Sequence, residues 1–433
     1  MTWNETRLKH LCVDSGTYGL NIAADYYSAA GTRLVRTSDI AADGSLKDPE
    51  SGVYVDVPIE VRHRLLPGDI LLSRSGTLGR SFLVPEHAQG HTFAGFLIRF
   101  RPKAGVEPRF LNYATQSAGF QGTVHSEAVA STIQNFNAER YANVSMRIPA
   151  SEEQRRIADF LDAETARIDR LVELRNRTLT LLAERMINRL DAAVRGVAAP
   201  GPKRVADYSP LGEVPLDWRQ GRLRSVDCDV QTGPFGSQLH AEDYVDAEWP
   251  VVNPANITPA GLVADNQVTV SDRVRARLER HILRTGDVVF GRRGELGRAG
   301  IVTEAQAGWV CGTGSLRVRF AKGAFHPGYL RRYLAIPAVR HYFQLQAIGS
   351  TMPNLNSSIL LNMPLLLPSL SEQAEIAQRC AEIESLAAKH RLLVERQVRL
   401  FLERRQALIT AAVTGQFDVT TASGRNVTEG VSA

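Results

Sequence analysis

The sequence predicts an α+β protein built as a tandem, pseudo-two-fold repeat: two irregular α/β domains joined by two long antiparallel helices that form a coiled coil. Three observations lead to this prediction. The same motifs occur twice in the same order, about half a chain length apart. The first part of each repeat is rich in Gly, Pro, Asn and short β-prone runs, and the second part is a long helical stretch. The 433 residues are enough for two or three domains.

The repeat is clearest in two motifs. "GDILLSRSGTLGR" at residues 68–80 matches "GDVVFGRRGELGR" at residues 286–298. "STIQNFN" at residues 131–137 matches "STMPNLN" at residues 350–356. Because the order of the motifs is kept along both halves, we interpret the chain as a tandem duplication with small loop changes.

Each half begins with a globular part and continues with a helix. Runs such as "RLLPGDILLS", "GFLIRF" and "SLRVRF" are typical of short strands bounded by turn residues. The composition changes abruptly after a proline to helix-forming residues. The expected helix caps are Ser151 with Gln154 and Ser371 with Gln373 at the N-termini, and Gly196 and Gly415 at the C-termini. The predicted segments are residues 1–150 (first domain), 151–200 (first helix and linker), 201–370 (second domain), 371–415 (second helix) and 416–433 (tail).

Apolar residues recur in both helices with an approximate 4-3 spacing. At about 1.5 Å per residue, a helix of roughly 40 residues is about 60 Å long, which is more than one small domain can cover. We therefore predict that the helices pair with each other; the alternative is that each lies on its own domain. The residues expected at the pairing seam are Ile157, Leu161, Ile168, Leu171, Leu182, Ile376, Ile383, Val394 and Phe401.

The composition allows an anionic partner without requiring one. The chain has 51 Lys and Arg against 46 Asp and Glu, a net charge of +5. The N-terminus has no apolar signal region, and the most apolar later run, "ILLNMPLLLPSL", is short and interrupted by proline, so we expect neither secretion nor a membrane span. The four cysteines are scattered without a CxxC pair, which predicts a reducing, cytoplasmic location.

The repeated glycine motif supplies the first candidate binding residues. Glycines let the backbone approach a polyanion and expose N–H groups, and arginines neutralise phosphates or hydrogen-bond guanine edges. We predict DNA contacts here; the alternative is a β-turn with solvated arginines, in which the glycines serve the fold alone. The candidates are Arg74, Ser75, Gly76, Thr77 and Arg80 in the first copy, and Arg292, Arg293, Gly294, Glu295 and Arg298 in the second.

Two further polar stretches are candidates. The "STIQNFN" and "STMPNLN" motifs offer hydroxyl and amide groups that suit adenine edges and phosphates, although Asn and Ser also form ordinary turns and caps. The stretch "RLVRTSDI" matches "WPVVNPANI" and follows a predicted strand. These stretches add Arg36, Thr37, Ser38, Ser131, Thr132, Asn135, Asn137, Asn253, Asn256, Ser350, Thr351, Asn354 and Asn356 to the candidate DNA-binding residues.

The sequence contains no recognisable catalytic motif. It lacks the GxxxxGK[ST] phosphate-binding loop and the GxSxG nucleophile elbow. "NPAN" at residues 253–256 has asparagine where the base-holding motif of amino-methyltransferases has an aromatic residue. His87 and His91 have a metal-like spacing, but Gly90 and Pro85 indicate a loop. We therefore predict a binding protein without catalytic, metal-binding or cofactor-binding residues.

The order of the motifs resembles that of the specificity (S) subunits of type I restriction-modification systems. The resemblance rests on the repeated glycine and "STIQNFN"-like motifs, the "EQRRIA" and "EQAEIA" helices and the closing "ITAAVTGQFDV", and it covers nearly the whole chain. It implies that each domain is a target recognition domain for one half of a split site in double-stranded DNA.

The resemblance also implies partners. In that family the two helices fix the spacing of the half-sites and dock two methyltransferase (M) subunits, and restriction (R) subunits join this core. S-adenosylmethionine, ATP and Mg²⁺ would then be bound by the partner subunits and not by this chain. Three alternatives stay open on the residues alone: a self-sufficient DNA-binding regulator, an enzyme with an unrecognised site such as a methyltransferase, and a coiled-coil scaffold that binds only proteins.

Overall fold

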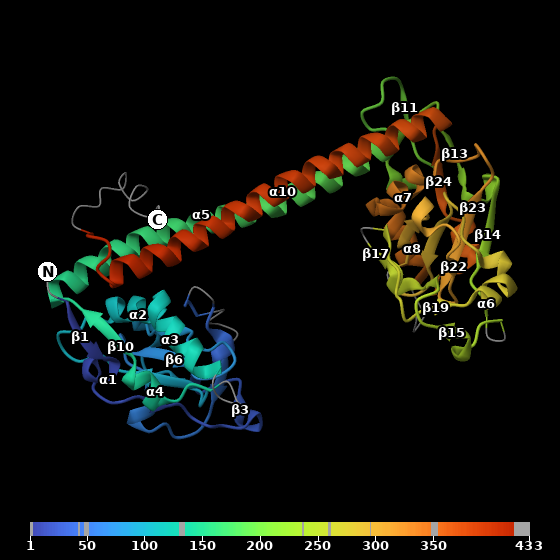
Figure 1. The fold of residues 1–433 in the computed structure, drawn as a ribbon. Helices are drawn as coiled ribbons and strands as arrows, with labels where there is room; N and C mark the ends of the chain where they lie inside the picture. The colour runs from blue at the N-terminus through green and yellow to red at the C-terminus, as the bar shows by residue number, and fades with distance from the viewer. Residues whose placement is uncertain are drawn as a thin grey trace. The chain divides into compact units, whose positions relative to one another are not determined.

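The chain forms two compact units and two long helices (Figure 1). The structure is a computed structural model that describes residues 3–41, 44–46, 52–129, 135–235, 238–258, 261–294, 296–347 and 354–419. Unit 1 contains Met1–Arg177 and Glu395–Ala433, and unit 2 contains Thr178–Val394. The helices α5 (Ser151–Val194) and α10 (Leu370–Val413) are each divided between the two units. The domain boundaries predicted from the sequence therefore stay predictions, because the compact units cut through both helices.

Unit 1 contains two four-stranded sheets among its described residues. The antiparallel sheet β2-β9-β6-β7 is formed by Thr17–Tyr18, Leu97–Phe100, Ile70–Ser73 and Ser81–Leu83. The sheet β3-β5-β4-β8, in which β4 and β8 are parallel, is formed by Tyr27–Ser28, Val53–Val55, Thr32–Val35 and Thr92–Phe93. The remaining elements include the pair β1 (Asn4–Arg7) and β10 (Ser145–Ile148) and the helices α1 (Leu8–Leu11), α2 (Pro108–Gln116), α3 (Ala118–Val129) and α4 (Ala138–Asn143).

Unit 2 repeats this topology strand for strand. The sheet β14-β23-β20-β21 is formed by Cys228–Thr232, Ser315–Phe320, Val288–Gly291 and Ala299–Ile301. The sheet β15-β19-β16-β22, in which β16 and β22 are parallel, is formed by Tyr244–Val245, Thr269–Val270, Trp249–Val252 and Val310–Cys311. The pair β13 (Arg219–Arg222) and β24 (Pro364–Leu367) and the helices α7 (Pro327–Ala335), α8 (Pro337–Ala347) and α9 (Ser357–Leu361) complete the match. Elements specific to unit 2 include α6 (Asp272–Arg277) and the pairs β11 (Lys203–Val205) with β12 (Glu213–Pro215) and β17 (Ile257–Thr258) with β18 (Gly261–Leu262).

The strand that precedes each glycine loop is buried on both faces. In β6, Ile70 and Leu72 pack into one buried cluster, whereas Leu71 packs into another. In β20, the side chains divide between two clusters in the same alternating way. Because successive side chains of a strand point to opposite faces, a strand buried on both faces needs an unbroken apolar run. This requirement explains the "ILL" and "VVF" of the repeated motif.

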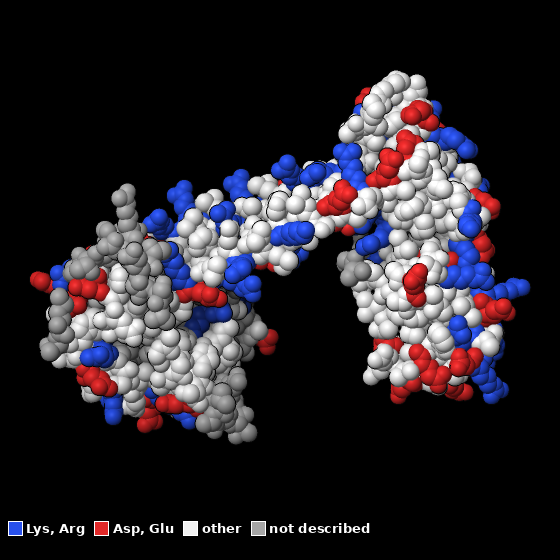
Figure 2. Space-filling model, turned by 45° about the horizontal axis from the view of Figure 1, so that its top comes forward, with Lys and Arg blue, Asp and Glu red and all other residues white. Residues whose placement is uncertain are grey.

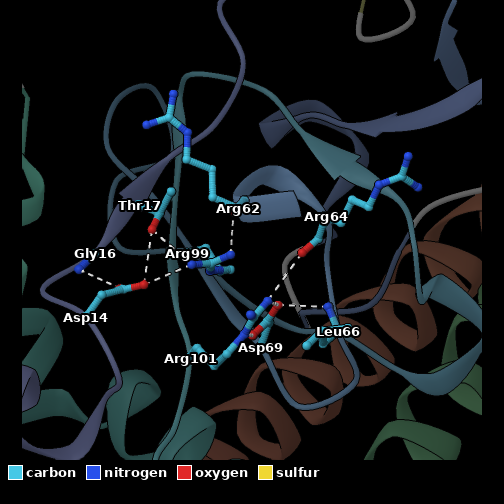
Figure 3. Close-up of polar contacts among 9 residues, drawn as sticks. All are labelled: Asp14, Gly16, Thr17, Arg62, Arg64, Leu66, Asp69, Arg99 and Arg101. Carbon is cyan, nitrogen blue, oxygen red and sulfur yellow. Dashed lines mark hydrogen bonds and ion pairs between the residues drawn. The ribbon is translucent and has the colours of Figure 1, made fainter. Parts of the chain in front are cut away.

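A buried ion pair explains the aspartate of the same motif (Figure 3). Asp69 is 1% exposed, and its carboxylate accepts hydrogen bonds from Arg101 Nε at 2.7 Å, Arg101 Nη2 at 2.8 Å and the Leu66 N–H at 2.8 Å. The hydrogen bonds that Arg101 donates to this carboxylate raise the pKa of Arg101. In unit 2, Arg319 pairs with the equally buried Asp287 at 2.6 Å. The aspartate therefore connects β6 to β9, and β20 to β23, in the two copies.

A second arginine lies beside this pair in unit 1. Arg99 is buried, and it donates to the Asp14 carboxylate at 2.9 Å, the Thr17 hydroxyl at 2.9 Å and the Arg62 carbonyl at 2.6 Å (Figure 3). These contacts tie β9 to the segment that leads into β2 and to the turn Val61–His63. The arginines of "LIRFR" thus serve the fold rather than a ligand.

In unit 1, the beginning of α5 packs antiparallel against the end of α10. The buried residues of this cluster include Ile157, Ala158, Leu161 and Ile168 of α5, and Leu408, Ile409, Ala412 and Val413 of α10. Asp169, the residue after Ile168, forms an ion pair with Arg405 at 3.0 Å. Residues early in one helix therefore contact residues late in the other.

In unit 2, the end of α5 packs against the beginning of α10 in the same antiparallel sense. Val194 and Cys380 are fully buried in one cluster, and Leu190 and Ile376 pack against it. Of the other residues predicted at the seam, Ile383 is buried, and Leu171, Leu182, Val394 and Phe401 are half-buried.

The N-terminal caps of both long helices differ from the prediction. Ser151 is the first residue of α5 rather than its cap, because the Ala150 carbonyl already accepts the N–H groups of Glu153 and Gln154. α10 begins at Leu370, where Ser369 and Glu372 form the cap: the Ser369 N–H donates to Glu372 Oε2 at 2.8 Å, and the Glu372 N–H donates to Ser369 Oγ at 3.3 Å.

The predicted cap glutamines have another use. Gln154 Nε2 donates to the Pro149 carbonyl and its Oε1 accepts from the Glu107 N–H, both at 2.9 Å. Gln373 makes the same pair of bonds, to the Pro368 carbonyl and from the His326 N–H. Each buried glutamine therefore joins a long helix to the residue before α2 or α7. The cap prediction for Ser371 with Gln373 is wrong, because Ser369 and Glu372 cap α10 and Gln373 binds His326 instead.

Glycines follow the last turn of both helices, as predicted. Gly196 and Gly415 have φ of 67° and 74°, which a residue with a Cβ rarely adopts. A Cβ on Gly196 would lie 2.7 Å from the Trp218 ring, and one on Gly415 would lie 3.1 Å from the Trp3 ring. The same tryptophan contact thus occurs in both units. The predicted fold class, a tandem repeat of two α/β domains joined by two long antiparallel helices, is confirmed.

Candidate nucleic-acid interface

The glycine loop of unit 1 connects β6 to β7, and that of unit 2 connects β20 to β21. The first glycine of each loop has a left-handed backbone, with φ of 75° at Gly76 and 81° at Gly294. A Cβ on Gly76 would meet no atom within 4 Å, and one on Gly294 would meet only Arg298 Nη2 at 3.9 Å. These glycines therefore lie at open loop tips, where the backbone is accessible to a ligand. Glu295 lies outside the described residues.

The second glycine of each loop is packed against the domain. A Cβ on Gly79 would lie 2.4 Å from Gln121 Oε1, and one on Gly297 would lie 2.8 Å from the Phe343 ring. The Gly79 N–H donates to the Tyr141 hydroxyl at 3.1 Å, which anchors the base of the loop. The second glycine thus serves the fold, as the alternative interpretation of the motif expected.

The last arginine of each loop holds a neighbouring turn. Arg80 Nη1 donates to the Ile40 carbonyl at 2.6 Å, and Arg298 Nη2 donates to the Pro254 carbonyl at 2.7 Å. Both carbonyls belong to the polar stretch that follows β4 or β16. Arg80 and Arg298 therefore have a structural role in addition to the predicted DNA contact, which stays a prediction.

The first arginine of each loop is backed by an aromatic ring. The Arg74 guanidinium carbon lies 4.9 Å from the centre of the Tyr18 ring, and that of Arg292 lies 5.2 Å from the centre of the Phe235 ring. Arg74 Nε donates to Asn135 Oδ1, and Arg292 Nε donates to a backbone carbonyl, both at 3.2 Å. Each guanidinium is thus held at its Nε edge.

The backbone around these two arginines is also equivalent. The Arg74 N–H donates to the Phe96 carbonyl at 2.9 Å, and the Arg292 N–H donates to the Gly314 carbonyl at 2.9 Å. Among the described residues, no carboxylate forms an ion pair with either guanidinium. Burial, followed by the charge of Arg293, lowers the pKa of Arg292. An anionic ligand beside Arg292 would stabilise its charged form and raise this pKa again.

The polar stretches after β4 and β16 form matching short turns. In unit 1, Arg36 pairs with Asp39 at 2.8 Å, and this contact raises the pKa of Arg36. In unit 2, Asn256 Oδ1 accepts from the Asn253 N–H at 2.9 Å, and Asn256 Nδ2 donates to the Val263 carbonyl at 3.0 Å. The side chains of Arg36 and Asn256 therefore already form hydrogen bonds within their own turns. The other two candidates of the stretch are the half-buried Thr37 and the exposed Ser38.

The asparagines of the "STIQNFN" and "STMPNLN" motifs have different roles. Asn137 Oδ1 accepts from the Arg140 N–H at 2.9 Å, and Asn356 Oδ1 accepts from the Ile359 N–H at 2.8 Å, so these two residues cap α4 and α9. Asn135 contacts Arg74, whereas Asn354 is exposed. The remaining candidates of these motifs, Ser131, Thr132, Ser350 and Thr351, lie outside the described residues.

A groove borders each glycine loop, and the two grooves occupy equivalent places. The groove of unit 1 has a volume of about 470 Å³ and is lined by the loop together with Gln121, His125, Arg405 and Gln406. The groove of unit 2 has a volume of about 720 Å³ and is lined by the loop together with Met186, Ile187, Arg340 and Gln344. The end of α10 thus makes the first groove polar, and the end of α5 makes the second more apolar.

Charge is mixed on the visible surface. Figure 2 shows lysine and arginine side chains interspersed with acidic ones over both units. Within the described residues, no helix is long and apolar enough to cross a membrane, and no three His, Cys, Asp or Glu side chains gather as metal ligands would. The visible face thus carries charges of both signs on each unit.

Sequence reasoning missed two kinds of residue in this region. The aromatic partners Tyr18 and Phe235 occur in "SGTYG" and "TGPFG", whose repetition could have indicated them. Phe96, which has the glycine Gly314 as its counterpart, breaks the repeat and gave no such indication. Its position beside Arg74 is visible only in the folded protein.

Comparison with known proteins gives matches to specificity domains and specificity subunits of type I restriction systems. The family model of the type I restriction modification DNA specificity domain matches residues 63–180. The specificity subunit of the type I restriction enzyme EcoKI of Escherichia coli K12 is 23% identical over 418 residues, which cover 92% of this chain and 85% of the relative.

Solved structures share the fold at low identity. A chain from a structure that concerns complex assembly and conformational transition of the type I R-M system has a TM-score of 0.70 and 18% identity, covering 96% of this chain and 98% of the other. The HsdS subunit from Thermoanaerobacter tengcongensis has a TM-score of 0.55 and 20% identity, covering 96% of this chain and 97% of the other.

Proposed function

Since the chain belongs to the specificity subunits of type I restriction-modification systems, we propose that it is the non-catalytic subunit that recognises a bipartite site in double-stranded DNA. Each unit contacts one half-site. The long helices α5 and α10 carry the surfaces to which methyltransferase subunits, and through them restriction subunits, are bound. S-adenosylmethionine, ATP and Mg²⁺ are bound by those partners.

The observation that supports DNA recognition most strongly is the equivalence of Arg74 and Arg292. Each lies at the start of an open glycine tip, rests on an aromatic ring and is held at its Nε edge. The terminal nitrogens of a guanidinium held in this way suit a phosphate or a guanine edge, which accept two parallel hydrogen bonds. A feature kept in both units suits the part of DNA that is common to both half-sites, the phosphate backbone.

Residues that differ between the two loops are the candidates for base recognition. Ser75 and Thr77 of unit 1 are replaced by Arg293 and Glu295 in unit 2. Hydroxyl groups contact several base edges, whereas an arginine prefers guanine and a glutamate accepts from cytosine. The two half-sites are therefore expected to differ in sequence.

Domain exchange tests this function. Residues 1–150 are replaced by the corresponding domain of another specificity subunit, the complex with its methyltransferase subunits is formed, and methylated adenines are mapped by single-molecule sequencing. We expect only one half of the recognised sequence to change. A change in both halves, or in neither, would contradict the proposal.

Two measurements separate the proposal from its alternatives. A sequence-specific footprint by the purified chain without partners would indicate a self-sufficient regulator. Binding of S-adenosylmethionine to the purified chain in equilibrium dialysis would indicate an enzyme. The proposal predicts neither result.

A further inference from the structure

A turn in unit 1 presents a large apolar side chain next to the glycine loop. The Leu97 N–H donates to the Ala94 carbonyl at 2.9 Å, so that Gly95 and Phe96 form the tip of the turn before β9. Phe96 is 61% exposed. An exposed phenylalanine needs an explanation only where it lies beside other functional groups, and this one does.

The turn is joined directly to the candidate DNA-contacting arginine. The Arg74 N–H donates to the carbonyl of Phe96 itself, so the two residues are hydrogen-bonded neighbours on adjacent chain segments. Arg74 also stacks on Tyr18, which is 40% exposed. Arg74 and Phe96 also continue the antiparallel register in which Ser73 pairs with Leu97, and directly opposed residues have side chains on the same face. The exposed Phe96 therefore lies beside the arginine at the start of the loop.

Unit 2 has the same turn without the ring. The Ser315 N–H donates to the Gly312 carbonyl at 3.0 Å, and the Arg292 N–H donates to the carbonyl of Gly314. A Cβ on Gly314 would lie 2.7 Å from Pro254, so this position in unit 2 has no room for a side chain. The ring is thus a property of unit 1 alone, although the backbone that carries it is common to both units.

We infer that Phe96 is a specificity-determining residue that contacts the 5-methyl group of a thymine in the half-site of unit 1. The inference rests on the proposed function and deepens it. The base edges in the major groove carry hydrogen-bonding groups and one apolar group, the thymine methyl, which an apolar side chain such as phenylalanine contacts. The thymine lies within one or two base pairs of the position that Arg74 contacts, because the two residues are adjacent.

Replacement of thymine by 2′-deoxyuridine tests the inference, because it removes only the methyl group. Each thymine of the half-site assigned to unit 1 is replaced in turn, and kcat/KM of methylation by the complex is measured. For the wild type, we expect one replacement to lower kcat/KM by about threefold to tenfold, the effect of one methyl contact. In F96A this dependence is lost, and the thymine-containing and deoxyuridine-containing duplexes are methylated equally.

Val61→Ala is the matched control, because Val61 is another exposed apolar residue of unit 1, at 83% exposure. This variant is expected to keep the deoxyuridine effect of the wild type. The thermal midpoint of F96A is compared with that of the wild type to confirm that the fold is unchanged.

The inference is overturned if the deoxyuridine effect is the same in the wild type and F96A, or if the half-site contains no thymine. It is also overturned if F96A weakens methylation equally on every duplex, which would indicate stacking or a wedge between bases. Failure of the proposed function is a different result: the wild-type complex would then show no bipartite motif.

Discussion

The glycine loop of unit 1 carries Ser75 and Thr77. Its Arg74 rests on the Tyr18 ring and is hydrogen-bonded to the backbone of the exposed Phe96. The loop of unit 2 carries Arg293, and its arginine rests on the half-exposed Phe235 with a glycine in place of Phe96. Two backbone hydrogen bonds are shared: the N–H groups of Ser73 and Gly291 donate to the carbonyls of Arg80 and Arg298, and those of Arg74 and Arg292 donate to the carbonyls of Phe96 and Gly314. The loops differ at Ser75, Thr77 and Phe96, and they share their glycines and arginines. This pattern is expected of two copies of one scaffold that contact different DNA sequences.

The largest loss of folding stability is expected on replacement of the buried aspartates, which both units share. Replacing Asp69 by Ala leaves the Arg101 guanidinium without its partner, and replacing Asp287 by Ala does the same to Arg319. We expect each variant to lose roughly 3 kcal/mol of folding stability, measured as the shift of the urea transition.

Glu60→Ala is the control, because Glu60 pairs with Arg62 on the surface and both side chains are about two-thirds exposed. Its effect is expected to be smaller. A large loss for Asp69→Ala with none for Asp287→Ala would show that the two units do not use the motif in the same way.

The two glycines of one loop provide the next test. In Gly79→Ala the new Cβ clashes with Gln121, and alanine must also adopt a left-handed φ. We expect this variant to lose roughly 2–3 kcal/mol of folding stability. Gly76→Ala meets only the strained φ and is expected to cost about 1 kcal/mol. Thermal unfolding of the two variants measures the difference. Equal losses would contradict the distinction between an open tip and a packed base.

Arg74→Ala and Arg292→Ala test the DNA contact. We expect the binding free energy of the assembled complex for its site to weaken by roughly 1–2 kcal/mol. The slope of log affinity against log salt should become shallower by about one, the effect of one lost phosphate contact. Folding stability should change by less than about 0.5 kcal/mol.

Arg62→Ala is the control for these variants, because Arg62 is an exposed arginine of unit 1 outside the glycine loop and pairs with Glu60. It is expected to leave the salt dependence at that of the wild type. An unchanged salt slope in Arg74→Ala would contradict a contact between Arg74 and a phosphate.

The capping asparagines are expected to give the smallest effect. Asn137→Ala and Asn356→Ala each remove one helix N-cap and should cost about 1 kcal/mol of stability. Neither should alter the methylated sequence. A changed motif in either variant would show that the cap residue also contacts DNA.

Much of the fold was predictable because each sequence pattern occurs twice. The positions of the long helices follow from composition, and the strand before each glycine loop follows from its apolar run. The cap of α10 was not predicted, since Ser369 and Ser371 offer similar local sequences and only the partner Glu372 distinguishes them.

The candidate site was predictable only in part. The motif indicated Arg74 and Arg292, but not that Arg80 and Arg298 would hold backbone carbonyls of distant turns. Those contacts join residues 40 or more positions apart, and no local pattern reports them. The exposure of Phe96 likewise depends on how its turn packs against the sheet.

The central claim is that one chain recognises DNA twice, once with each unit. The most direct test is to assemble the wild-type chain with its methyltransferase subunits and to map every methylated adenine in a genome by single-molecule sequencing. We expect one bipartite motif with two different halves and a spacer of fixed length. A stable, active complex that methylates a continuous motif, or no defined motif, would contradict it.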